Sequence, residues 1–135
     1  MKDGTVTAPA KVLIVEDEPI IGADLCQMVA ELGHEAVGPF ASAEEAIDVI
    51  AISCPSIALL DVNLTDGTTS EAVADALAER GIPFAFMTGS VDPVVSRQAS
   101  PYQCAVVMKP VGGDVVEILV EELIARRRQL RTLVA

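Results

Sequence analysis

The chain has 135 residues, 51% of them hydrophobic, and a formal net charge of −11. This length gives one domain with a single core, and the apolar content fits a folded globule rather than a disordered segment. The composition excludes two classes of partner. No apolar stretch approaches the ~20 residues that a membrane span needs, and such a negative surface repels nucleic acid.

The N-terminal residues 1–10, MKDGTVTAPA, contain no apolar secretion segment and are expected to form a flexible arm before a single domain at residues 11–131. The cysteines, Cys26, Cys54 and Cys104, are widely spaced and set among apolar residues. We interpret them as buried, reduced thiols of a cytoplasmic protein, not as a disulfide or metal set.

The first half of the chain alternates strand and helix signals. An apolar run at residues 12–15 predicts a buried strand, and the apolar stripe of residues 19–32 predicts a helix. A short second strand is expected at residues 34–38. Ser42, with Glu45 three residues later, has the pattern of a capping box and predicts the start of the second helix.

The second half continues this alternation. Further strands are expected at residues 57–60, 84–87 and 105–108, and further helices at residues 68–80 and 115–128. Between the last two strands, Asp92 and Pro93 begin a stretch with almost no apolar stripe, which predicts only a short, weakly held helix. The whole pattern indicates a doubly wound, five-stranded parallel sheet of order 2-1-3-4-5, with helices on both faces, as in flavodoxin-like folds.

A basic cluster, Arg126, Arg127, Arg128 and Arg131, follows the apolar stripe of the last predicted helix. Cations at the end of a helix complement its negative dipole and keep the end solvated. We interpret the cluster in this way, with a partner-docking patch as the alternative.

Polar residues able to take part in phosphoryl chemistry follow four of the predicted strands. Glu16 and Asp17 follow the first strand, Asp61 the third, Thr88 the fourth and Lys109 the fifth. Ligands of open parallel sheets bind outside the carboxyl ends of the strands. The sequence therefore predicts that these side chains gather in one site.

The residue types suit phosphoryl transfer. Asp61 is the candidate nucleophile, because a carboxylate can form an aspartyl phosphate. Crowded acids invite Mg²⁺, and we expect Asp17 and Asp61 as direct ligands, Glu16 as a ligand through water and the backbone carbonyl of Asn63 as a further ligand.

The other two residues would act on the phosphoryl group. Lys109 is expected to pair with Asp61 at rest and with a phosphoryl oxygen after transfer. The Thr88 hydroxyl is expected to donate to another phosphoryl oxygen and to carry the following loop with it.

With these residues placed, the chain resembles the receiver domains of two-component response regulators. The matching motifs are V-E-D-E-P (residues 15–19), L-L-D-V-N-L-x-D-G (59–67), M-T-G-S (87–90) and M-K-P (108–110). The resemblance implies a sensor histidine kinase as donor, Mg²⁺ as cofactor, Asp61 as phosphoacceptor, Glu16 and Asp17 as the acid pair, Thr88 as the switch hydroxyl and Lys109 as the lysine. It also implies a cis bond between Lys109 and Pro110.

One position departs from the family pattern. Most members carry a Tyr or Phe three residues before the lysine, where this chain has Val106. The segment P-F-A-F-M-T-G-S (residues 83–90) resembles the PFxFATG pattern of a single-domain subgroup that also lacks this aromatic. Tyr102 is a candidate substitute, and a loop aromatic that covers the core is the alternative interpretation.

We therefore predict a stand-alone, cytoplasmic receiver, a monomer or weak homodimer, that signals by changing a protein-binding face. It would not be an enzyme beyond self-phosphorylation and autodephosphorylation. The alternatives are a phosphate sink for a kinase, a small phosphohydrolase with an aspartate nucleophile, and a flavin or nucleotide-binding module of the same fold. The acids after the first strand disfavour the last alternative, since they repel phosphate unless a cation intervenes.

Overall fold

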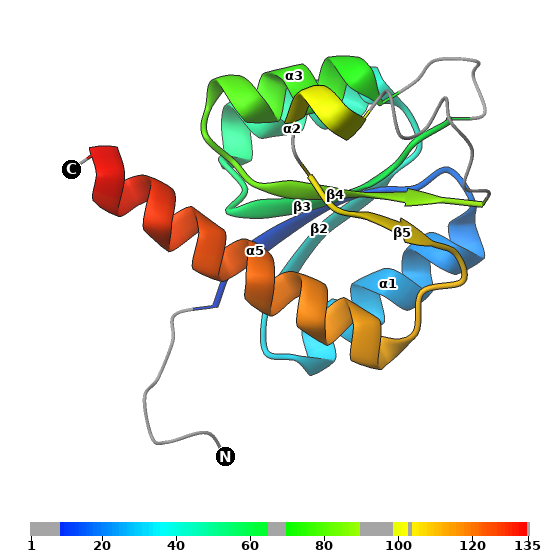
Figure 1. Ribbon diagram of the computed structural model, residues 1–135. Coiled ribbons are helices and arrows are strands. Elements are labelled where there is room, and N and C mark those ends of the chain that lie inside the picture. The colour runs from blue at the N-terminus through cyan, green and yellow to red at the C-terminus, as the bar shows by residue number, and fades with distance from the viewer. Residues whose placement is uncertain (1–8, 65–69, 90–98, 103, 135) are drawn as a thin grey trace.

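The protein is described by a computed structural model in which residues 9–64, 70–89, 99–102 and 104–134 are placed. One parallel sheet of five strands runs through its middle in the order β2-β1-β3-β4-β5 (Figure 1). The strands are β1 (Lys11–Val15), β2 (Glu35–Phe40), β3 (Ile57–Asp61), β4 (Phe84–Thr88) and β5 (Val106–Met108). The helices are α1 (Pro19–Glu31), α2 (Ala43–Ser53), α3 (Glu71–Glu79), the 3-10 helix η1 (Ser100–Tyr102) and α5 (Gly113–Val134). The predicted fold class and strand order are confirmed.

Some predicted boundaries were wrong. The second strand does not end before Pro39 but pairs with β1 as far as Phe40. The last helix does not end at Arg128, because α5 continues to Val134 and the arginine cluster lies within it. The predicted weak helix after Asp92 lies outside the described residues, as does the predicted arm apart from Pro9 and Ala10. Ala10 is buried, and its N–H donates to Nδ1 of His34 at 3.0 Å, so the ordered domain includes it.

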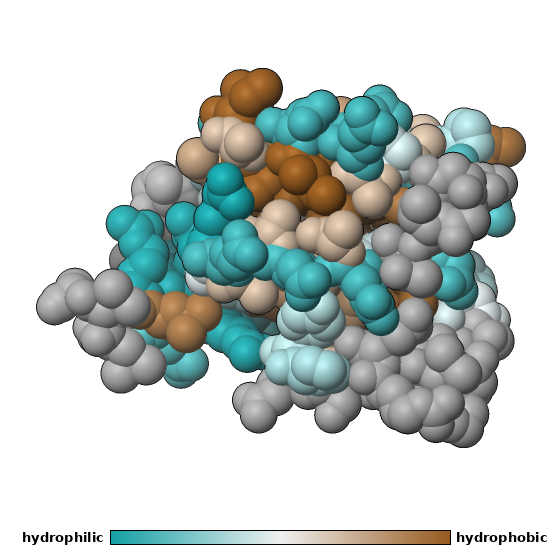
Figure 2. All heavy atoms as spheres, turned by 90° about the horizontal axis from the view of Figure 1, so that it is seen from above, coloured by the Kyte–Doolittle hydropathy of each residue, from teal (hydrophilic) through white to brown (hydrophobic). Residues whose placement is uncertain are grey.

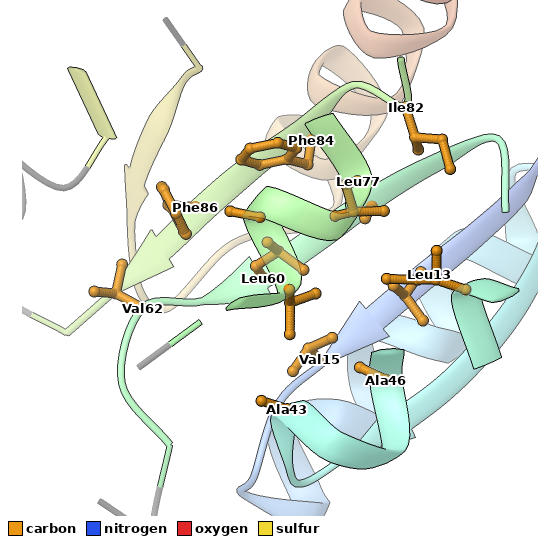
Figure 3. Close-up of a cluster of buried hydrophobic side chains, with 14 of the residues drawn as sticks. Leu13, Val15, Ala43, Ala46, Leu60, Val62, Leu77, Ile82, Phe84 and Phe86 are labelled. Atoms are coloured by element: carbon orange, nitrogen blue, oxygen red, sulfur yellow. The ribbon is translucent and has the colours of Figure 1, made fainter. Parts of the chain in front are cut away.

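The sheet separates two hydrophobic clusters, because alternate residues of each strand point to opposite faces. On one face, Leu13, Leu60 and Phe86 pack beneath α2 and α3 (Figure 3). On the other face, neighbouring residues of the same strands pack against α1 and α5 (Figure 1). The outer surface over α2 and α3 carries a hydrophobic patch bordered by hydrophilic residues (Figure 2). No helix in the described part of the chain is both long and apolar enough to cross a membrane.

Helix α2 has a defined residue at each end. As predicted, Ser42 is its N-cap, and the Ser42 hydroxyl accepts a hydrogen bond from the Glu45 N–H at 3.2 Å. Its C-cap is Cys54, a left-handed residue with φ of 48° whose N–H donates to Ile50. The expectation of three buried thiols was wrong, because Cys54 is exposed and Cys26 and Cys104 are only partly buried.

The left-handed cap predicts that glycine would stabilise the protein at position 54. A side chain at this backbone conformation costs about 1 kcal/mol, which glycine avoids at the expense of some unfolded-state entropy. We expect Cys54→Gly to raise the free energy of unfolding by about 0.5 kcal/mol and Cys54→Val to lower it by about 1 kcal/mol. Urea unfolding of the reduced proteins measures both changes. Equal stability of the Gly and Val variants would contradict the cap assignment.

Candidate functional site

Strand register brings the first two acids together. Val15 of β1 is level with Leu60 of β3, so the next residues, Glu16 and Asp61, are neighbours at the carboxyl edge of the sheet. Asp61 is in turn level with Met87 of β4. Strand alternation places the side chains of Glu16 and Asp61 on the same face of the sheet.

The fifth strand brings in a cation. Lys109 follows β5, and its N–H donates to the Thr88 carbonyl at 2.8 Å, which extends the β4–β5 pairing. The Lys109 Nζ lies 2.5 Å from Glu16 Oε1 and 2.9 Å from Asp61 Oδ2. The predicted pairing of Lys109 with Asp61 is therefore present, and Glu16 is a second partner that the sequence analysis did not anticipate.

Glu16 is held from several sides. It is 2% exposed, its N–H donates to the Phe40 carbonyl at 2.9 Å, and its Oε2 accepts from the Glu18 N–H at 3.2 Å. Behind it, a Cβ on Gly22 would lie 2.7 Å from the Pro39 Cβ. Only glycine therefore lets α1 approach β2 this closely, and that approach fixes the peptide that leaves β1.

The end of β3 is held by a residue that the sequence analysis missed. Ser70, which precedes α3, is buried, and its hydroxyl donates to the backbone carbonyl of Asp61. The Ser70 N–H donates to the Val62 carbonyl at 3.1 Å, and the Val62 N–H donates to Met87 at 3.0 Å. The sequence analysis placed Ser70 inside a helix predicted at residues 68–80, whereas α3 begins at Glu71, so the sequence contained no signal for this role.

The two central groups perturb each other. Burial, followed by the negative charge of Glu16, raises the pKa of Asp61 to about 7, although the Lys109 hydrogen bond opposes this. Burial alone would lower the pKa of Lys109, but its hydrogen bonds to Glu16 and Asp61 outweigh burial and raise it. Lys109 therefore stays charged, and the crowding of the charges shows in the raised pKa of Asp61.

The acids are arranged to hold a cation. One carboxylate oxygen from each of Glu16, Asp17 and Asp61 lies within 4.8 Å of the others. The Lys109 ammonium contacts two of these carboxylates, those of Glu16 and Asp61. A divalent cation with oxygen ligands, such as Mg²⁺, fits this donor set. Asn63 is exposed two residues after Asp61, and its role as a carbonyl ligand stays a prediction.

The remaining candidate residues lie around this centre. Thr88 ends β4 and is 3% exposed, and its switch role stays a prediction. The peptide bond between Lys109 and Pro110 is cis, as the resemblance implied.

Val106 stands three residues before Lys109, where most receivers have Tyr or Phe. Val106 is half-buried and packs against the core below α3. Tyr102 packs edge-to-face on Phe84 and Phe86, and its hydroxyl donates to Asp75 of α3 at 2.6 Å. Tyr102 is thus tied to the core and to α3, as its interpretation as a loop aromatic covering the core expects.

Comparison with known proteins finds regulators that are similar to this chain over most of its length. The transcriptional regulatory protein PdtaR of Mycobacterium tuberculosis is 27% identical over 132 residues, which cover 97% of this chain and 64% of PdtaR. The phyllosphere-induced regulator PhyR of Methylorubrum extorquens is 31% identical over 126 residues, 88% of this chain and 47% of PhyR. The chain thus spans between about half and two thirds of the length of these relatives. No family model matches.

Solved structures show the same fold. The receiver domain of a modulated diguanylate cyclase from Desulfovibrio desulfuricans superposes with a TM-score of 0.82 and 29% identity, over 90% of this chain and 98% of that domain. The PhyR receiver domain of Erythrobacter litoralis has a TM-score of 0.73 and 29% identity, over 87% and 91% of the two chains. A CheY-like receiver from Methanospirillum hungatei has a TM-score of 0.79 and 26% identity, over 90% and 99%. With its strand order, these similarities show that the chain belongs to the receiver domains of response regulators.

Proposed function

We propose that this receiver accepts a phosphoryl group on Asp61 from a sensor histidine kinase, in a Mg²⁺-dependent reaction in the cytoplasm. The observation that carries the proposal is the position of the Asp61 carboxylate, 2.9 Å from the Lys109 ammonium and beside two further acids at the carboxyl edge of the sheet. A nucleophile, a charge-neutralising cation and a metal-ligand set in one pocket are the parts that phosphoryl transfer needs.

In the proposed reaction, an Asp61 oxygen forms a bond to phosphorus while the bond to the donor nitrogen breaks. Bound Mg²⁺, held by Asp17, Asp61 and the Asn63 carbonyl, with Glu16 acting through water, would neutralise charge on the phosphoryl oxygens. The Lys109 ammonium would move from the free carboxylate to a phosphoryl oxygen. The Thr88 hydroxyl would donate to another, and its movement would pull on the segment after β4.

An exposed apolar surface supports a protein partner for this receiver. Met108 before the lysine, and Val115 and Ile118 in the first turns of α5, are 52%, 36% and 55% exposed. Val115 and Ile118 are three positions apart and share a face of α5, and exposed apolar side chains of this size on one face are typical of interaction surfaces. The relatives PdtaR and PhyR carry names of regulators, and one solved PhyR is described as an anti-anti-sigma factor. We propose that phosphorylation changes the surface formed by β5 and α5.

The first test concerns the phosphoacceptor. We expect Asp61→Asn to abolish the mass gain of 80 Da that acetyl phosphate and Mg²⁺ give the wild-type protein, because the amide is not a nucleophile towards phosphorus. Asp48→Asn, on the exposed side of α2, removes an equal charge and should leave uptake unchanged. Intact-protein mass spectrometry measures both. Undiminished uptake by Asp61→Asn would remove the assignment, and rapid phosphate release without a lasting adduct would favour the phosphohydrolase.

The second test concerns the metal. We expect Asp17→Asn to weaken Mg²⁺ binding by at least about tenfold, since a carboxylate ligand is replaced by a neutral amide. Glu18→Gln is the matched control, because Glu18 is the exposed next residue and is not part of the acid cluster. Calorimetric titration with MgCl₂ measures both affinities. Equal losses in the two variants would indicate diffuse charge attraction instead of a site.

The third test uses the raised pKa of Asp61. The folded protein binds this proton more tightly than the unfolded chain, so the stabilisation is complete below pH 3.8 and is lost as the pH rises through about 7. Without Mg²⁺, we expect the stability of the wild type relative to Asp61→Asn to fall by on the order of 2 kcal/mol between about pH 5 and 8.

Comparison of the two proteins cancels the contributions of groups that titrate in both. Urea unfolding in EDTA across this range gives the difference, and saturating Mg²⁺ should restore the wild type at pH 8. A difference that does not change with pH would show that Asp61 is not held protonated by its surroundings.

A further inference from the structure

Ser70, the residue before α3, contacts the main chain of the proposed phosphoacceptor. It is 1% exposed, and its hydroxyl donates a hydrogen bond to the backbone carbonyl of Asp61. The Ser70 N–H donates to the Val62 carbonyl at 3.1 Å. Ser70 therefore binds two successive carbonyls at the end of β3, one through its side chain and the other through its main chain.

The hydrogen bond to Asp61 lies just beyond the ladder between β1 and β3. Pairing of these strands ends at Leu60, which is level with Val15, and Asp61 is the next residue. Pairing with β4 on the other side still includes Asp61, which is level with Met87. Ladder hydrogen bonds hold a strand residue by residue, so Ser70 adds a constraint at the point where the hold of β1 on β3 ends.

Helix α3 holds Ser70 in turn. The Ser70 carbonyl accepts from the Ala74 N–H at 2.9 Å, and Val73, Ala74 and Leu77 of α3 are buried in the core. Ser70 is also the N-cap of this helix, but its side chain makes no capping hydrogen bond. A serine at this position commonly uses its hydroxyl to accept from the first turn of the helix. Here the hydroxyl is directed to Asp61 instead, as a role in the site requires.

We propose that Ser70 is a positioning residue for phosphoryl transfer, an inference that rests on the proposed function of Asp61. By holding the Asp61 carbonyl, Ser70 sets the place of the carboxylate relative to the Lys109 ammonium, which is 2.9 Å away. A single methylene joins this carboxylate to the main chain, so a displacement of the peptide is passed on to the nucleophile. A misplacement of about 1 Å at a reacting group can cost about a hundredfold in rate.

The first test follows phosphorylation by acetyl phosphate at saturating MgCl₂. Ser70→Ala removes the hydroxyl and keeps the N–H, and we expect its maximal rate to fall at least about tenfold. Its KM for acetyl phosphate should stay within about twofold, because the hydroxyl serves the nucleophile and not the donor. Ser70→Thr keeps a hydroxyl and should recover the rate to within about threefold of the wild type. If the extra methyl group prevents folding, Ser70→Cys has nearly the volume of serine but only a weak donor, and it should lose as much rate as Ser70→Ala.

Ser56→Ala is the matched control. Ser56 precedes β3, and its hydroxyl accepts from the Lys11 N–H at 3.2 Å, so this variant removes a serine contact with the main chain at the opposite end of the same strand. We expect its maximal rate to stay within about twofold of the wild type, whatever its effect on the free energy of unfolding. A wild-type rate in Ser70→Ala, or equal losses in the Ser70 and Ser56 variants, would overturn the proposal.

A second test does not depend on phosphorylation. Burial, followed by the charge of Glu16, raises the pKa of Asp61 to about 7. An Asp61 carboxylate that Ser70 no longer holds can turn towards solvent, so Ser70→Ala should lower this pKa, with the proton bound at least about threefold more weakly. Titration of ¹³C-labelled carboxyl signals in EDTA measures the change. An unchanged pKa would overturn the positioning role, whereas a lowered pKa in a protein that takes up no phosphoryl group would contradict only the proposed function.

Discussion

The Lys109 ammonium is the interaction on which the acidic pocket depends. It contacts Glu16 and Asp61 at once, and it is the cation that the described residues place between them. Without it, two buried carboxylates would face each other at a cost of several kcal/mol. Even with it, burial and the charge of Glu16 raise the pKa of Asp61. The folded protein thus holds acids close together at a buried position, and functional sites commonly carry such a cost in stability.

Strand geometry accounts for the position of three of the charged residues in this pocket. Glu16, Asp61 and Lys109 each lie on the α1 and α5 side of the sheet by the alternation of their strands. Parallel register then brings the three strand ends level, and the Lys109 N–H extends the ladder to Thr88. Because the scaffold is a sheet buried on both faces, the side chains at its edge converge without any loop having to position them.

Most of this arrangement could be predicted from the sequence, because apolar runs mark buried strands and the residue after each run is read directly. The strand order, the acid cluster and the Lys109–Asp61 pair followed from that pattern. The contact of Lys109 with Glu16 could not be predicted, since it depends on the rotamers of two long side chains. Nor could the support from Ser70, because the start of the third helix was predicted too early and Ser70 then lay within it. The length of α5 was underestimated because the inward-facing positions change from aliphatic residues to arginine. The helical spacing of apolar residues, on which the prediction relied, is interrupted there although the helix continues.

Charged side chains of opposite sign lie at the two edges of the sheet. Acids gather at the carboxyl edge, where β1 and β3 end, and arginines gather at the amino edge, where the same strands begin. The arginine at the amino edge is hydrogen-bonded to the residue before β3, and the acceptor aspartate ends that strand five residues later. Arg127 and Asp61 therefore lie at opposite ends of one buried strand, β3, and the packing of α5 and the chemistry of the acids both depend on where that strand is held.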